Sequence, residues 1–252
     1  MDANIAIFEQ EAAAEAESSS APPLQFVRLN ASERTQHMIF MICFVVLALT
    51  GFMLKVPDET VQRLGSLGQS VFFYRSLVHR FAGTVLILVS IYHLFYLLFT
   101  KAGRRWMWDM LPRFKDAKDI AGNMLYFVNI KKEPPEFDRF SYKQKMEYGA
   151  LIAGNTLMSV TGLMLWWESY FDKFFLDIAL IVHGREAVLA CLAIIVWHMY
   201  EIHFKPHKSP VDDVWITGLI DEEEMKAEHK GWYRKIMTDT ELQQIYLRQV
   251  EK

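Results

Sequence analysis

The chain has 252 residues, of which 52% are hydrophobic and 14% aromatic, and its formal net charge at pH 7 is −3. A mean hydropathy of only +0.09 in so apolar a chain indicates long apolar segments separated by polar tails and loops. The slightly negative charge provides no overall basic field that would attract nucleic acid, so no nucleic-acid partner is expected.

The N-terminal segment, "MDANIAIFEQEAAAEAESSSAPP", is acidic and rich in alanine and serine. It lacks the basic region and the apolar region of a signal peptide. We therefore expect residues 1–31 to form a flexible tail.

Four apolar stretches follow, and each approaches the 20 or so residues that a helix needs to cross a bilayer. The sequence predicts an all-α integral membrane protein, a bundle of four transmembrane helices within residues 32–203. The expected spans are about 37–55, 79–99, 146–167 and 174–203. The polar segment 101–145 is expected to hold short interfacial helices, because "EPPEF" interrupts any long one. Residues 204–252 are expected to form a C-terminal extension.

The positive charges predict the orientation of the spans. Eleven Lys and Arg residues lie between the second and third spans and eight follow the fourth. Only four lie between Leu54 and Phe81, where the first apolar stretch ends and the second begins, and one lies between the third and fourth spans. Because loops rich in Lys and Arg stay in the cytoplasm, both termini and the long middle loop are expected there.

Five histidines lie in or beside the apolar spans, where ionisable side chains are rare and usually functional. They are His37, His79, His93, His183 and His198. His79 and His93 are 14 residues apart, about 21 Å along a helix, and His183 and His198 are separated by a similar length of about 22 Å. The second and fourth spans therefore each carry one imidazole at the outer depth and one at the inner depth.

Imidazoles at equal depth on different helices suit the two axial positions of a haem iron. A zinc site would need a closed tetrahedral set of ligands instead. The outer pair is predicted to be His79 with His183. The inner pair contains His198, and its partner is either His37 or His93, with His203 a weaker third candidate. A haem-free, proton-conducting four-helix membrane protein is the alternative from another functional class.

Several fragments together resemble the membrane cytochrome b subunit of bacterial formate dehydrogenases and nickel–iron hydrogenases. They are "ERTQHMIFMICFVVLALTGFML" in the first span, "LVHRFAG" around His79, "SVTGLML" in the third span, and "HGREA" with "WHMYEIHF" in the fourth. The resemblance covers roughly residues 28–205 and includes all four spans in order.

The resemblance implies two haem b groups, the outer held by His79 and His183 and the inner by His37 and His198. His93 departs from the family pattern, and it is a candidate alternative inner ligand or pocket residue. Arg34, Arg80 and Arg185 are candidate contacts for the anionic haem propionates.

The resemblance also implies a quinone, menaquinone or ubiquinone, that exchanges electrons beside the inner haem. The family often has a basic–aromatic–Asn-x-Gly-Gln-Lys motif there, whereas this chain reads Arg139-Phe140-Ser141-Tyr142-Lys143-Gln144-Lys145. Ser141 replaces the asparagine and Lys143 the glycine, so Ser141, Gln144 and Lys145 are the candidate quinone contacts.

The implied function is to anchor a multi-subunit oxidoreductase in the bacterial inner membrane and to carry electrons between a redox partner and quinone. The expected partners are an iron–sulfur or multihaem electron-transfer subunit and a catalytic subunit. The chain itself is expected to have no primary substrate site. The reverse direction of electron flow, from quinol through the same haems to an outer multihaem acceptor, is an alternative. The residues do not distinguish the two directions.

Overall fold

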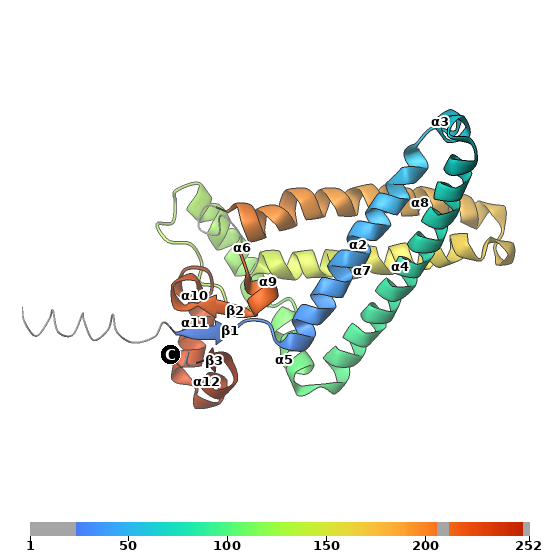
Figure 1. Cartoon of the computed structure of the whole chain (residues 1–252). Helices are drawn as coiled ribbons and strands as arrows, with labels where there is room; N and C mark the ends of the chain where they lie inside the picture. The colour runs from blue at the N-terminus through green and yellow to red at the C-terminus, as the bar shows by residue number, and fades with distance from the viewer. Residues whose placement is uncertain (1–23, 206–211, 249–252) are drawn as a thin grey trace, which may run out of the picture.

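A computed structural model describes residues 24–205 and 212–248 of the chain. Within these residues, four helices are long and apolar enough to cross a membrane: Ala31–Lys55, Gly65–Phe99, Tyr142–Trp166 and Lys173–Phe204. They form two helical hairpins, and a small domain lies at one end of the bundle (Figure 1). The predicted fold class, an α-helical integral membrane bundle, is confirmed.

The first hairpin consists of α2 (Ala31–Phe52) and α4 (Gly65–Phe99), which pack along each other. A capping box starts α2, because the Asn30 side chain accepts from the Glu33 N–H and the Glu33 carboxylate accepts from the Asn30 N–H. The connection holds a 3-10 turn, η1 (Met53–Lys55), and the short helix α3 (Asp58–Arg63). The predicted second span, about 79–99, lies within a longer helix, since α4 already starts at Gly65. Gly65 turns the chain with a φ of +57°, and no proline interrupts the helix beyond it.

The second hairpin consists of α7 (Tyr142–Trp166) and α8 (Lys173–Leu192), joined through the 3-10 turn η2 (Glu168–Tyr170). Beyond Leu192 the helix continues with π-helical geometry as η3 (Ala193–His198) and η4 (Tyr200–Phe204). A π-helix has more residues per turn than an α-helix, so this segment changes which face His198 occupies relative to His183.

The segment between the hairpins contains α5 (Lys101–Met110) and α6 (Phe114–Phe127). Trp106 and Met110 of α5 are buried with Phe140 against the C-terminal end of α4. On α6, Phe114 has 94% of its surface exposed. Two short helices therefore occupy the polar segment in which interfacial helices are expected.

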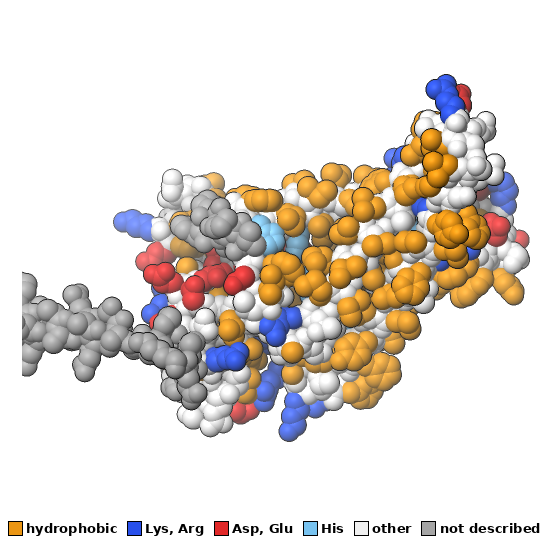
Figure 2. Space-filling view, in the orientation of Figure 1, with side chains coloured by type: hydrophobic (Ala, Val, Ile, Leu, Met, Phe, Trp, Pro, Cys, Tyr) orange, Lys and Arg blue, Asp and Glu red, His pale blue; other side chains and the backbone are white. Residues whose placement is uncertain are grey.

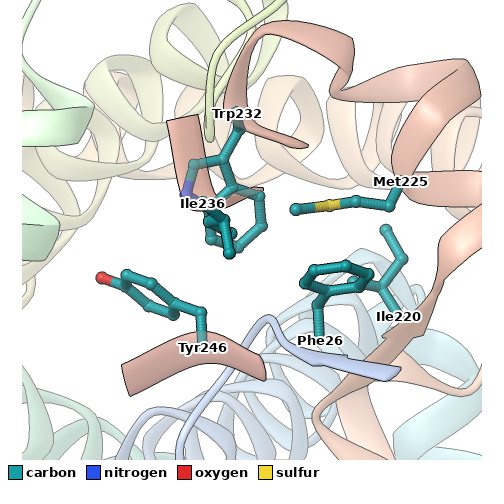
Figure 3. Packing of buried hydrophobic residues seen from close by; sticks show 6 residues of the cluster. All are labelled: Phe26, Ile220, Met225, Trp232, Ile236 and Tyr246. Atoms are coloured by element: carbon teal, nitrogen blue, oxygen red, sulfur yellow. The ribbon is translucent and has the colours of Figure 1, made fainter. Parts of the chain in front are cut away.

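A small terminal domain is built from both ends of the described chain, residues 24–29 and 212–248. Its sheet has the order β2-β1-β3 with antiparallel pairing, from β1 (Gln25–Val27), β2 (Leu219–Asp221) and β3 (Leu247–Arg248). Four helices complete it: α9 (Val214–Thr217), α10 (Glu222–Glu228), α11 (Lys230–Thr238) and α12 (Thr240–Tyr246). Its buried core consists of Phe26, Ile220, Met225, Trp232, Ile236 and Tyr246 (Figure 3).

The prediction of a flexible tail through residue 31 is wrong for residues 24–31, and its residues 1–23 lie outside the described chain. Phe26 is fully buried, because the terminal domain needs this aromatic side chain to fill its core. Of the predicted extension 204–252, residues 212–248 are folded, and residues 206–211 and 249–252 lie outside the described chain.

Two buried arginines join the terminal domain to the segment before α7. Arg28 and Arg139 are only 6% and 5% exposed, and both guanidinium groups lie over the rings of Phe140 and Trp232. Burial, with Arg139 close by, lowers the pKa of Arg28 to about 9. The aromatic rings and backbone carbonyls thus hold two like charges together at this junction.

The outer surface of the bundle is apolar over most of its length. Figure 2 shows hydrophobic side chains along the helices, with Lys, Arg, Asp and Glu gathered toward the two ends. Such a surface suits the hydrocarbon interior of a bilayer, where unpaired charges are costly.

Candidate functional site

The outer histidine pair joins the two hairpins. His79 of α4 faces His183 of α8, and their ring centroids are 6.4 Å apart. The structure therefore brings together the predicted outer pair, although its two residues are 104 positions apart in the chain.

Each of these imidazoles is held by a threonine hydroxyl on the other helix of its own hairpin. The Nδ1 of His79 lies 2.8 Å from Thr50 Oγ1, and the Nδ1 of His183 lies 2.9 Å from Thr161 Oγ1. Both threonines donate their single hydroxyl hydrogen to a helix carbonyl, at Val46 and Leu157, respectively. Each threonine oxygen must therefore accept from an Nδ1–H, which leaves the lone pair on Nε2. This is the tautomer that binds a metal, with its second nitrogen fixed by an outer partner.

A glycine follows each of these threonines and makes room for the imidazole. A Cβ atom at Gly51 would lie 3.6 Å from His79 Cε1, and one at Gly162 would lie 3.2 Å from His183 Cε1. The two hairpins thus carry the same arrangement, a Thr-Gly pair on the first helix and a histidine on the second.

The inner pair consists of His37 and His198, whose ring centroids are 6.3 Å apart. The Nδ1 of His198 is bonded to the carboxylate of Glu147 on α7. An ionised carboxylate only accepts hydrogen bonds, so His198 also carries its hydrogen on Nδ1 and its lone pair on Nε2. His37 reaches this level from the first turns of α2.

Both ring pairs have the separation that two axial ligands of one iron need. A metal–imidazole bond is about 2 Å long and a ring nitrogen lies about 1 Å from its centroid, so the two centroids are expected roughly 6 Å apart. Among residues 24–205 and 212–248, no group of three or more His, Cys, Asp or Glu could hold a metal ion. Two-histidine sites of this kind match a metal whose remaining ligands come from a porphyrin.

His93 occupies a different position from the paired histidines. Its Nδ1 lies 2.7 Å from Gln36 Oε1 and its Nε2 lies 2.9 Å from the Tyr148 hydroxyl. Both ring nitrogens are therefore engaged in hydrogen bonds, whereas His37 is the imidazole that meets His198. This arrangement favours a pocket residue over an alternative iron ligand.

The three candidate propionate arginines have distinct surroundings. Arg34 donates to the backbone carbonyls of Ile216 and Thr217, so it ties α2 to the terminal domain. Arg80 lies 5.3 Å from the ring centroid of Trp166, and Arg185 is exposed on α8. Of the three, Arg80 and Arg185 remain close in sequence to the outer pair, since Arg80 directly follows His79 and Arg185 lies two residues after His183.

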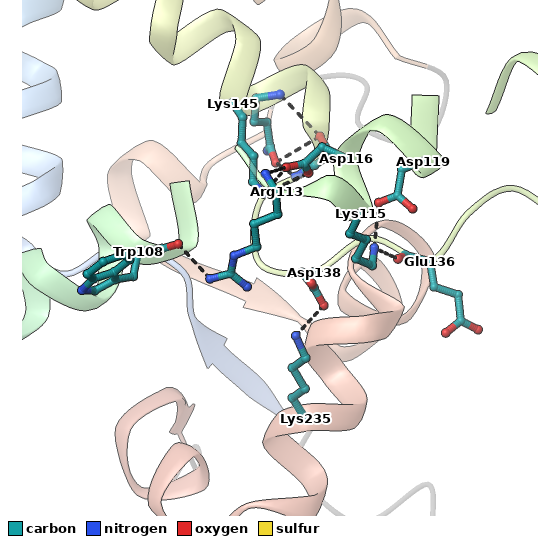
Figure 4. A network of polar contacts seen from close by, with 11 residues as sticks. Trp108, Arg113, Lys115, Asp116, Asp119, Glu136, Asp138, Lys145 and Lys235 are labelled. Atoms are coloured by element: carbon teal, nitrogen blue, oxygen red, sulfur yellow. Dashed lines mark hydrogen bonds and ion pairs between the residues drawn. The ribbon is translucent and has the colours of Figure 1, made fainter. Parts of the chain in front are cut away.

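The three candidate quinone residues lie at the start of α7. Ser141 caps this helix, and Gln144 completes the capping box by accepting from the Ser141 N–H at 2.9 Å. Lys145 is 9% exposed and pairs with Asp116 of α6 at 2.9 Å (Figure 4). In this arrangement the three side chains fix the helix start and its contact with α6.

Comparison with known proteins identifies the family. Residues 28–211 match the family described as prokaryotic cytochrome b561. The chain belongs to this family. It is similar to the formate dehydrogenase cytochrome b556(fdo) subunit of Escherichia coli K12, with 26% identity over 85% of this chain and 95% of that protein. The nitrate-inducible cytochrome b556(Fdn) subunit of the same organism is 26% identical over 83% of this chain and 91% of its own length. A formate dehydrogenase cytochrome b556 subunit of Haemophilus influenzae is 23% identical over 84% of this chain and 83% of its own length.

As a prokaryotic cytochrome b561, the chain is a membrane protein that binds haem b and transfers electrons. The resemblance stated from the sequence fragments is thereby confirmed, and the haem-free alternative has no support.

Sequence reasoning missed Thr50, Thr161 and Glu147 as partners of the histidines. The repeated Thr-Gly pair in "LALTGFML" and "SVTGLML" was the available signal. No comparable pattern marks Glu147, whose partner His198 lies 51 residues away.

Proposed function

We propose that this cytochrome binds two haem b groups and carries electrons across the membrane between a partner redox subunit and quinone. The observation that supports the proposal most directly is the presence of two facing imidazole pairs at two levels of the bundle, 6.4 and 6.3 Å between centroids.

His79 with His183 would hold the outer haem, and His37 with His198 the inner haem. Haem b supplies a one-electron carrier at each level when it is bound. Thr50, Thr161 and Glu147 keep three of the four imidazoles in the tautomer with Nε2 free for a metal.

Both termini are proposed to lie in the cytoplasm. The strand β1 from the N-terminal part pairs with β2 and β3 from the C-terminal part, which supports one common side. The excess of Lys and Arg in the middle loop and C-terminal tail supports the cytoplasmic face of a bacterial inner membrane.

The relatives support membership of a formate-dehydrogenase-like complex. Their names describe cytochrome subunits of formate dehydrogenase, and the match covers almost their whole length. We infer that a catalytic subunit and an iron–sulfur subunit deliver electrons at the outer haem. Quinone, either menaquinone or ubiquinone, would be reduced near the inner pair, where polar side chains are concentrated.

The proposal is tested by measuring haem content and reduced-minus-oxidised spectra of the purified protein. We expect two haem b per chain, and His183→Ala should remove one of them, about half of the α-band signal. Glu186→Gln, one turn further along the same helix, is the control and should retain both. A wild-type ratio of one haem per chain, or an unchanged spectrum after His183→Ala, would contradict the assignment.

A further inference from the structure

A continuous row of hydrogen-bonded side chains crosses the inner end of the bundle. Tyr148 OH lies 2.9 Å from His93 Nε2, and His93 Nδ1 lies 2.7 Å from Gln36 Oε1. Gln36 Nε2 lies 3.0 Å from Ser32 Oγ, and Ser32 Oγ lies 3.2 Å from Tyr92 OH. The row therefore joins α7, α4 and α2.

The donors and acceptors in this row have a defined direction. The Gln36 amide nitrogen donates to Ser32, so its oxygen is the atom that faces His93. That oxygen can only accept, which places the imidazole hydrogen on Nδ1 and the lone pair on Nε2. The Tyr148 hydroxyl must then donate to His93 Nε2. His93 is thus a neutral base that already accepts a hydrogen bond from a phenol.

The row lies beside the inner histidine pair but does not include it. Gln36 immediately precedes His37, and Tyr148 immediately follows Glu147, which binds His198. The rings of Trp106, Tyr148 and Tyr96 surround the His93 imidazole, with centroids 5.6, 6.0 and 6.5 Å away. Glu33 supplies a carboxylate to the same cluster by accepting from Tyr96 OH at 2.9 Å.

The other end of the row reaches the surface. Ser32 lies in the first turn of α2, and Tyr92 has 52% of its surface exposed. Gln36, in contrast, is only 7% exposed. Because an amide transfers protons poorly, Gln36 acts here by orienting the imidazole.

We propose that Tyr148 and His93 form a proton-transfer pair for the quinone reaction beside the inner haem, an inference that rests on the proposed function. In quinol oxidation, the quinol hydroxyl gives its proton to the Tyr148 oxygen while Tyr148 gives its own proton to His93 Nε2. His93 becomes an imidazolium whose Nδ1–H still donates to Gln36. The second quinol proton passes to water, and the two electrons leave to the redox partner. Quinone reduction is the same transfer in reverse.

The experiment uses the purified holoprotein and menadiol, a soluble quinol, with reduction of the haem α-band followed by stopped flow in H₂O and D₂O. Tyr148→Phe and His93→Gln should keep both haems and be fully reduced by dithionite. Reduction by menadiol should be at least about tenfold slower, as is typical when a general base is removed. The solvent isotope effect should also differ from that of the wild type. Tyr74→Phe, which removes the hydroxyl of a tyrosine that lies outside this row and has 63% of its surface exposed, should match the wild type in both measurements.

The possible failures are distinguishable. If menadiol does not reduce the wild-type haems, the proposed quinone function itself fails. If the wild type reacts and both variants match it, the proton-transfer pair is wrong. If the variants react more slowly but their isotope effect is unchanged, the row has only a structural role in holding the helices together. That result also overturns the proposal. Loss of one haem in His93→Gln would make His93 a ligand instead.

Discussion

The outer and inner histidine pairs have nearly the same ring separation but different surroundings. Both outer imidazoles are held by neutral threonine hydroxyls, each in a Thr-Gly pair. At the inner level a carboxylate, Glu147, holds His198, and the His93 row lies alongside. With the proposed haems in place, the outer level would serve electron transfer alone, whereas the inner level would combine it with the proposed proton-accepting groups.

Removing one inner ligand should have the largest effect and should separate the two levels. We expect His37→Ala to lose the inner haem and all reduction by menadiol, because the remaining ligand His198 has no imidazole opposite it. The outer haem should stay and be reducible by dithionite. Haem content and the α-band measure this, and loss of both haems together would show that the levels are not independent.

Neutralising Glu147 should change the inner level without emptying it. Glu147→Gln leaves an acceptor for His198 but removes the negative charge that makes the imidazole a more basic ligand. The midpoint potential of the inner haem should therefore rise. The rise is about 59 mV if the variant binds the ferric haem tenfold less tightly than the wild type does and binds the ferrous haem equally. Redox titration checks this. Thr161→Val is the matched outer variant and should shift the outer potential by less, since it removes no charge.

The two glycines offer a graded test within the outer level. Gly162→Ala would place a Cβ 3.2 Å from His183 Cε1, close enough to displace the ring, whereas Gly51→Ala leaves 3.6 Å to His79, an ordinary contact. We expect Gly162→Ala to lower the occupancy of the outer haem and Gly51→Ala to retain it. Equal behaviour of the two variants, measured by haem content, would contradict the close fit at Gly162.

The smallest effect on the haems is expected from the core of the terminal domain. Phe26→Ala should destabilise this domain by about 3–5 kcal/mol, because it leaves a cavity in a small core. Hydrogen exchange should show loss of protection in residues 212–248. Both α-bands should remain, and loss of the inner haem would instead mean that the terminal domain positions His37.

The sequence predicted the four spans and the depth of each histidine, because hydropathy and helical rise depend only on local composition and spacing. It left His37 and His93 as competing inner partners, since both lie at the same depth. The choice between them depends on tertiary contacts, because Gln36 and Tyr148 bind both ring nitrogens of His93.

Other features depended on geometry that spacing does not encode. The expected separation of about 22 Å between His183 and His198 assumes an α-helix throughout, whereas residues 193–198 are π-helical. The strand Gln25–Val27 was missed because three residues carry no readable alternation. Its partner strands lie around residues 220 and 247, so each is about two hundred positions away in the sequence.

The order of strands in the terminal domain has a consequence for biosynthesis. The central strand, β1, is translated before any of the spans, while its two neighbours, β2 and β3, are translated after all of them. The domain can therefore close only after all four spans have been translated. A closed domain would mark a subunit whose four spans have all been made, and shorter nascent fragments would keep the β1 edge exposed to chaperones and proteases.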